Sequence, residues 1–79
     1  MDVILFGISR EIVGEKKLTV NRAENIQTVG ALKQWMKQKY PQLEKLTSIA
    51  VAVDSEYADD EQSLLDENEV AIIPPVSGG

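Results

Sequence analysis

Residues 69–79 read EVAIIPPVSGG, a short apolar segment followed by two prolines and an ending of two glycines. Residues 70–73 are apolar at every position, which is typical of a central strand buried on both faces. Proline cannot donate a hydrogen bond to a sheet ladder, so the strand has to end at the two prolines. The segment therefore predicts a last strand over 69–74 and a flexible tail over 74–79.

Three more segments have the composition or the alternation of strands. They are residues 2–9, rich in Val, Ile, Leu and Phe, residues 17–23, which alternate at Leu18 and Val20, and residues 48–54. The first of these is as apolar as the last strand, so we expect the two to lie side by side at the centre of a sheet. Residues 10–17 are the predicted connection, with Gly14 as its turn residue, and residues 63–69 are predicted to form a turn with room for one helical turn.

One helix is predicted between the second and third strands. Thr28 is its expected N-cap, and Pro41 ends it after residues 29–40. The apolar side chains on one helical face are Val29, Leu32, Met36, Tyr40 and Leu43. This order of elements predicts one domain over residues 1–79 with an α+β, ubiquitin-like β-grasp fold, in which a mixed sheet of about four to five strands packs on one main helix.

Charged residues in the strands predict which face of the sheet stays in solvent, because successive side chains point to opposite faces. Asp2, Asp54 and Glu69 mark that face in the first, third and last strands. The apolar residues that share it are then uncovered, and they are Ile4, Phe6, Ala50, Ala52, Ala71 and Ile73. An uncovered apolar patch indicates a protein interface; the alternative is ordinary surface apolarity.

Charge and missing residue types exclude several functions. Eight Lys+Arg against thirteen Asp+Glu give a net charge of −5, which argues against nucleic acid or an anionic membrane as partner and suits a basic protein surface. The chain has no Cys and no His, so it has neither a thiol nucleophile nor the commonest general base and metal ligand.

The acidic run DSEYADDEQ at 54–62 lacks the glycine and spacing of an EF-hand loop, so we expect a solvated loop without a metal. Residues 1–9 resemble neither a signal peptide nor a membrane span, which predicts a cytoplasmic protein.

The two terminal glycines point to the C-terminal carboxylate as the functional group. An extended segment from Pro75 to Gly79 spans ~16–18 Å, and it is thin and free of charged side chains, so it can enter a narrow channel in a partner. A carboxylate is ionised at pH 7 and is a poor electrophile. Once activated, for example as an acyl-adenylate, it can be attacked by a nucleophile, and glycine leaves the reacting carbonyl uncrowded.

The segments VILFGISREIVGE (3–15) and VAVDSEYADDEQSLLDENEVAIIPPVSGG (51–79), with the helix between them, resemble the MoaD family, the small sulfur-carrier subunits of molybdopterin synthase. The ending EVAIIPPVSGG is the most specific part. The resemblance implies that an E1-like enzyme adenylates Gly79 with ATP and that a sulfur donor converts it to a thiocarboxylate. The tail then enters the large subunit and donates sulfur to cyclic pyranopterin monophosphate, which forms the molybdopterin dithiolene. The chain would be a non-catalytic subunit that binds no cofactor itself.

The resemblance also implies the site residues and partners. Gly78 and Gly79 carry the chemistry, and the candidate partner-binding residues are Phe6, Ile73, Tyr57, Pro74, Pro75, Val76, Ser77 and Arg10. The expected partners are the large catalytic subunit, in a heterotetramer, and the E1-like enzyme; the free chain is expected to be a monomer. Asp54 stands where the family often has Asn, which should affect only a local turn. Arg10 and Glu11 match a charged pair of the family, for which we expect a structural or rim-contact role.

Three other functions stay open. A sulfur carrier of the same fold that serves thiamine or tRNA thiolation also ends in Gly-Gly, but the PPVSGG ending is less typical of it. A ubiquitin-like modifier would join its terminal glycine to a lysine through an isopeptide bond. The third is a β-grasp binding module in which the tail has no role. A free-standing enzyme is disfavoured, because the sequence offers no nucleophile and base pair.

Overall fold

The computed structural model describes residues 1–46 and 49–74, so the predicted strand start at residue 48 and the tail after Pro74 lie outside the described part. The elements are β1 (Asp2–Leu5), α1 (Gly7–Val13), β2 (Lys17–Thr19), the 3₁₀ helix η1 (Arg22–Glu24), α2 (Val29–Lys39), the 3₁₀ helix η2 (Pro41–Lys45), β3 (Ala50–Val53), β4 (Glu56–Ala58) and β5 (Val70–Ile73).

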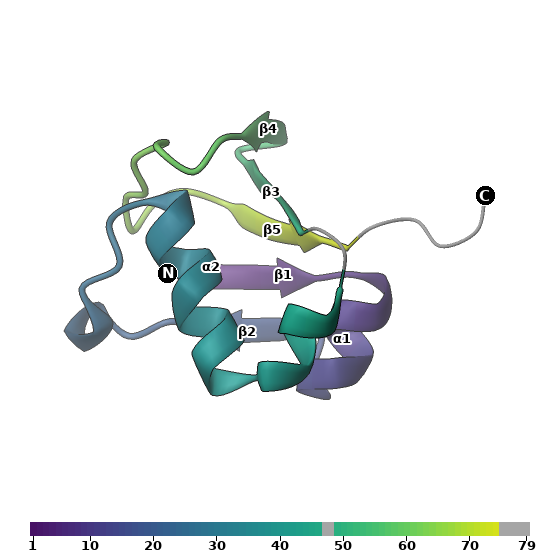
Figure 1. Cartoon of the computed structure of the whole chain (residues 1–79). Helices are drawn as coiled ribbons and strands as arrows, with labels where there is room; N and C mark the ends of the chain where they lie inside the picture. The colour runs from purple at the N-terminus through teal and green to yellow at the C-terminus, as the bar shows by residue number, and fades with distance from the viewer. Residues whose placement is uncertain (47–48, 75–79) are drawn as a thin grey trace.

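The strands form a mixed sheet. Within the described residues it has five strands in the order β2-β1-β5-β3-β4. β1 and β5 are parallel, and the other neighbouring pairs are antiparallel. The first and last strands therefore lie together at the centre, as predicted, and α2 crosses one face of the sheet (Figure 1). This arrangement confirms the predicted α+β class.

Helix α2 begins and ends close to the predicted residues. The Thr28 side chain accepts a hydrogen bond from the Ala31 N–H at 3.1 Å, which satisfies one of the free N–H groups at the start of the helix. The helix ends at Lys39, and Pro41 begins η2. The predicted apolar face is buried at Val29, Leu32, Met36 and Leu43 and partly buried at Tyr40. No helix among the described residues is long and apolar enough to cross a membrane.

The core lies between α2 and the face of the sheet that carries no charges. Six strand residues on that face are at most 8% exposed: Val3, Leu5, Val51, Val53, Val70 and Ile72. They join Leu32 and Met36 of α2 in one cluster. Full burial of such a side chain stabilises the fold by about 1.5–3 kcal/mol relative to exposure. The face with the apolar residues is therefore the one that packs on α2, as the alternation of apolar and charged residues predicted.

The first strand is shorter than predicted, because the chain turns into a helix after it. β1 ends at Leu5, whereas the prediction continued the strand to Ser9. Phe6 is still extended, but Gly7 has a φ of +54°, which glycine adopts readily and which redirects the chain. The buried Ser9 hydroxyl donates to the Phe6 carbonyl oxygen at 2.5 Å. The strand prediction is therefore wrong beyond Leu5.

The predicted connection over residues 10–17 is helical in its first half. Ile12 and Val13 in α1 are partly buried against the core, so the segment packs instead of looping through solvent. The Gly14 N–H donates to the Arg10 carbonyl oxygen at 2.8 Å, and Gly14 ends the helix with a φ of +88°. Its role as a turn residue is confirmed, because a left-handed residue of this kind is a common helix C-cap.

Two other predicted segments have different bounds. β2 ends at Thr19, although the prediction continued it by four residues; its alternating residues Leu18 and Val20 are both buried, as expected. Residues 63–69 form a turn that contains no helical segment. The strand does not extend further because the chain enters η1 at Arg22.

The acidic run over 54–62 contains a strand that the prediction missed. Asp54 and Ser55 have φ values of +51° and +71°, and they form a two-residue loop between β3 and β4. Two consecutive residues with positive φ are the requirement of a type I′ hairpin turn. β4 is the edge strand of the sheet, so the run is divided into a two-residue turn, a strand and a loop over residues 59–62.

Candidate functional site

A row of side chains crosses the uncovered face of the sheet. Ile4 is paired with Ala71, Ala71 with Ala52, and Ala52 with Tyr57, so the row runs over β1, β5, β3 and β4. The two alanines lie between larger neighbours, and the surface is hollowed there by about 320 Å³. We call this the outer-face hollow; its lining residues are Ile4, Phe6, Ala52, Ser55, Tyr57, Glu69, Ala71 and Ile73.

Three of the predicted partner-binding residues meet at the outer-face hollow. Phe6 is 48% exposed and Tyr57 74% exposed, while Ile73 is partly buried. Large apolar side chains with this exposure are unusual on a strand face that has no other role. Ala52, predicted to be uncovered, is only 8% exposed, because it forms the floor of the hollow between its two paired neighbours. The predicted face is therefore correct, but it is hollowed and not smooth.

The first residue of the predicted tail, Pro74, lies beside this hollow. Pro74 follows β5 directly, and its Cγ lies 3.1 Å from the point where a Cβ on Gly7 would stand. The start of the tail is thus seated against the first residue of α1, next to Phe6. Arg10 is exposed on α1 and does not line the hollow. The remaining candidates lie outside the described residues, and they are Pro75, Val76, Ser77, Gly78 and Gly79.

Asp54 links the hairpin turn to the start of β5. Its carboxylate accepts hydrogen bonds from the Glu69 N–H and from the Asn68 side-chain amide, both at 2.8 Å. The Asp54 N–H donates in turn to the Glu69 carbonyl oxygen at 2.8 Å. These contacts hold the end of β3 and the start of β5 together at the edge of the hollow, which is a local role in the turn.

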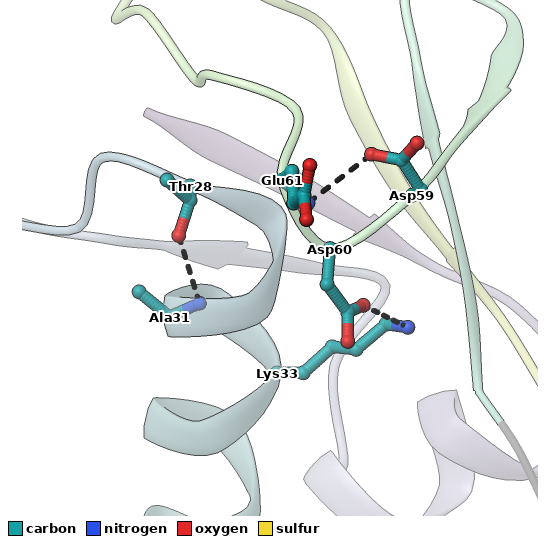
Figure 2. A network of polar contacts seen from close by, with 6 residues as sticks. All are labelled: Thr28, Ala31, Lys33, Asp59, Asp60 and Glu61. Carbon is teal, nitrogen blue, oxygen red and sulfur yellow. Dashed lines mark hydrogen bonds and ion pairs between the residues drawn. The ribbon is translucent and has the colours of Figure 1, made fainter.

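The acidic loop, residues 59–62, caps the start of α2. Carbonyl oxygens of Asp60 and Gln62 accept hydrogen bonds from the Gly30 and Val29 N–H groups at 2.9 and 3.0 Å. Figure 2 shows the side chains nearby, where the Lys33 ammonium lies 2.7 Å from an Asp60 carboxylate oxygen. Helix N-termini carry free N–H groups and a partial positive charge. The carbonyl oxygens of the loop accept from two of these N–H groups, and its acidic side chains place negative charge near the helix start.

The same loop does not assemble a metal site. The Asp59 carboxylate accepts from the Glu61 N–H at 3.1 Å, so it is used within the loop (Figure 2). Across residues 1–46 and 49–74, no group of three or more His, Cys, Asp or Glu side chains is arranged to hold a metal ion. The acidic run is thus explained by its contacts with α2.

A larger hollow, of about 550 Å³, opens between the N-terminus and the turn before β5 and contains none of the candidate residues. The Met1 ammonium donates to the Val20 carbonyl oxygen at 3.1 Å. The Gln27 amide donates to the Asn25 side-chain oxygen, also at 3.1 Å. These polar groups at its rim bond to each other, so its size alone does not make it a site.

Comparison with known sequences matches residues 3–79 to the ThiS family. The chain is 36% identical to a molybdopterin synthase sulfur carrier subunit of Arabidopsis thaliana over 78 residues, which is 98% of this chain and 80% of the relative. It is 32% identical to a protein of the same name in Caenorhabditis elegans over 80 residues, covering 98% of this chain and 94% of the relative.

Solved structures have the same fold. Small archaeal modifier protein 1 from Methanosarcina acetivorans is 26% identical with a TM-score of 0.79, covering 99% of this chain and 94% of the other. A putative molybdopterin converting factor subunit 1 from Pyrococcus furiosus is 20% identical with a TM-score of 0.80, covering 95% of both chains. In a complex of subunits 1 and 2 of the Helicobacter pylori molybdopterin-converting factor, one chain matches at 23% identity and a TM-score of 0.65, covering 99% of this chain and 96% of the other. The likeness at these low identities concerns the fold, which is the ubiquitin-like β-grasp.

Proposed function

This chain belongs to the ThiS family, and on that premise we propose that it is the sulfur carrier subunit of a molybdopterin synthase. The observation that carries the proposal is the length of the match, because the family match ends at residue 79 and the relatives of that name cover 98% of the chain. A shared fold alone would not indicate a function. A match that extends through the Gly-Gly ending includes the group on which the chemistry depends.

The proposed chemistry takes place at the Gly79 carboxylate. A carboxylate oxygen attacks the α-phosphorus of ATP in the activating enzyme, and pyrophosphate leaves. A sulfur nucleophile then attacks the carbonyl carbon of the acyl-adenylate, AMP leaves, and a thiocarboxylate is formed. The chain has no Cys, so its terminus is the group available to carry the sulfur. It supplies the sulfur to cyclic pyranopterin monophosphate in the large subunit and is not itself the catalyst.

The outer-face hollow is proposed to seat both the large subunit and the E1-like enzyme. Phe6, Tyr57 and Ile73 line it, and Pro74 starts the tail at the adjacent position. Docking over the hollow therefore places the tail next to the partner surface, and an extended tail of ~16–18 Å is long enough to reach a buried active site. With two large subunits and two small ones, the assembly is a heterotetramer, and the free chain is a monomer.

Mass spectrometry of the intact chain tests this function. Incubation with its activating enzyme, ATP and a sulfide source should add the mass that corresponds to the replacement of one oxygen by sulfur. The modified chain mixed with the large subunit and cyclic pyranopterin monophosphate should return to its original mass as the dithiolene forms. A chain that is adenylated but never acquires sulfur would contradict the proposal.

A ubiquitin-like modifier is the second candidate, because of the likeness to small archaeal modifier protein 1 at 26% identity and a TM-score of 0.79. Adenylation of Gly79 is common to both functions, but a modifier ends in an isopeptide bond to a lysine. Peptide mapping of proteins from the native cell distinguishes them. Branched lysines that carry the C-terminal residues of this chain, without any free thiocarboxylate, would favour the modifier.

A further inference from the structure

The outer-face hollow changes in polarity along β5. Phe6 and Ile73 line it at the end where the tail begins, whereas Ser55 and Glu69 line it at the other end. Ile73 lies four positions after Glu69 along a nearly extended chain, which corresponds to about 13 Å at the rise of a strand. One end of the docking surface is therefore apolar, and the end farther from the tail carries a carboxylate.

Glu69 is held by its backbone while its side chain has no bond. Its N–H donates to the Asp54 carboxylate at 2.8 Å, and its carbonyl oxygen accepts from the Asp54 N–H at 2.8 Å. Among the described residues, no donor or cation bonds its carboxylate, and the residue is exposed. The Asp54 contacts fix the position of the Cα, so the charge is presented in a defined place without an internal partner.

Among the described residues, the surface beside Glu69 carries more acidic than basic side chains. A second hollow of about 400 Å³ adjoins the outer-face hollow, with Ile4 and Glu69 lining both. The charged residues that line this second hollow are Asp2, Asp66, Glu67, Glu69 and Lys17. The ammonium of Lys17 lies 3.6 Å from the Asp2 carboxylate, so this cation, which belongs to the described lining of the second hollow, is paired with Asp2 and not with Glu69.

We propose that Glu69 is the electrostatic anchor of the docking surface, and that the large subunit places an arginine or lysine against it while an apolar side chain enters the outer-face hollow. The inference rests on the proposed function and adds to it a specific contact and a partner chemistry. Charge complementarity argues for this occupant. If the partner placed no cation there, docking would remove water from the Glu69 carboxylate without any compensating interaction. Two contacts about 13 Å apart also fix the orientation in which the tail is delivered.

Glu69→Gln tests the anchor without altering the backbone bonds to Asp54. Binding to the large subunit from the same organism should weaken about tenfold at low ionic strength, and Glu69→Lys should weaken it about a hundredfold. Both differences should shrink to a few-fold in 0.5 M salt, because salt screens charge pairs near a surface. Titration calorimetry or surface plasmon resonance at several salt concentrations gives these values, and thermal unfolding checks that each variant is folded.

Glu44→Lys is the matched control for net charge. Glu44 is exposed in η2 and does not line either hollow, so the same change in charge there should alter affinity less than threefold. A charge reversal of one arginine or lysine in the large subunit should restore binding to Glu69→Lys and identify the paired residue.

Three other outcomes are distinguishable. If the wild-type chain binds the large subunit and Glu69→Gln binds within twofold of it with the same salt dependence, the anchor is wrong while the proposed function stands. If Glu44→Lys weakens binding as much as Glu69→Lys, the effect is one of net charge and the anchor is again wrong. A wild-type chain that does not bind the large subunit overturns the proposed function, and the anchor with it.

Discussion

The acidic loop over 59–62 and the outer-face hollow differ in how many of their polar and apolar groups have partners within the chain. The loop has the residue types associated with metal binding or catalysis, yet its carbonyl oxygens bond to the first N–H groups of α2 and Asp60 pairs with Lys33. The hollow is lined by residues of four strands and their flanking positions, yet Phe6 and Tyr57 stay 48% and 74% exposed around it.

The contrast teaches that unsatisfied groups are a better indication of function here than reactive ones. A charged segment whose hydrogen bonds and ion pairs are made internally stabilises the fold. An apolar surface that no other described element covers, with a carboxylate at one end that has no partner among the described residues, indicates an interface. Each of the following experiments changes one of these regions or the C-terminal residues.

Deletion of Gly79 should have the largest effect on function. It withdraws the carboxylate by ~3.5 Å, and a misplacement of about 1 Å at a reacting centre already costs on the order of 10²-fold in rate. Thiocarboxylate formation, followed by intact mass, should be lost. Removal of a terminal residue should leave the melting temperature nearly unchanged. Ser77→Ala is the control and should be mild, since it keeps the length; a deleted chain that still forms the thiocarboxylate at the normal rate would contradict the carrier function.

Phe6→Asp should abolish binding to the large subunit without unfolding the domain, because it introduces a charge into the outer-face hollow but not into the core. Ile8→Asp is a matched control, since Ile8 is 44% exposed and does not line the hollow. We expect at least a hundredfold loss of affinity for the first variant and less than a threefold loss for the second. Equal effects of the two variants would show that the hollow has no special part in docking.

Gly30→Ala should destabilise the fold and leave docking intact. A Cβ added at residue 30 would lie 3.2 Å from the carbonyl oxygen of Asp60 and 3.2 Å from the Cβ of Asp60. The acidic loop would therefore have to move away from α2. Overpacking costs about 1–3 kcal/mol, which outweighs the gain of up to about 1 kcal/mol in helix propensity. Urea unfolding should show a net loss of about 1 kcal/mol, compared with a change within about 0.5 kcal/mol for the exposed Gln34→Ala. A variant that binds the large subunit poorly while fully folded would connect the loop to docking after all.

Asp60→Asn should have the smallest effect. It removes the ion pair with Lys33 but retains the carbonyl oxygen that accepts from Gly30. Partly exposed pairs contribute about 0.2–1 kcal/mol, so unfolding in urea should shift slightly at low salt and not in 0.5 M salt. A loss of several kcal/mol, or any loss of sulfur transfer, would mean that the acidic loop does more than cap α2.

Sequence reasoning predicted the elements that have a long hydrophobic pattern or a local signal. Thr28 and Pro41 marked the ends of α2, and the charges at Asp2 and Glu69 marked the outer face of the sheet. It failed at α1, because the strand-like run continues past Leu5 and Gly7 was not recognised as the residue that turns the chain.

The other failures concern structure that depends on tertiary pairing. β4 is a three-residue edge strand whose formation depends on the turn at Asp54 and Ser55 more than on its own composition. A two-residue loop between alternating segments was the available signal, although DS is a weaker hairpin signature than NG or DG. Glu69 was used only to mark a face, since the absence of a partner for its side chain becomes visible when the neighbouring strands are in place.

The central position of β5 also determines when a newly made chain can complete its sheet. β5 pairs with β1, at the opposite end of the sequence, so the sheet closes only after nearly the whole polypeptide has been synthesised, and such long-range pairing is slow compared with local folding. The same strand supplies Ala71 and Ile73 to the outer-face hollow, and Glu69 directly precedes it. Nascent or proteolysed chains that stop before β5 therefore lack part of the outer-face hollow, which we propose as the docking surface.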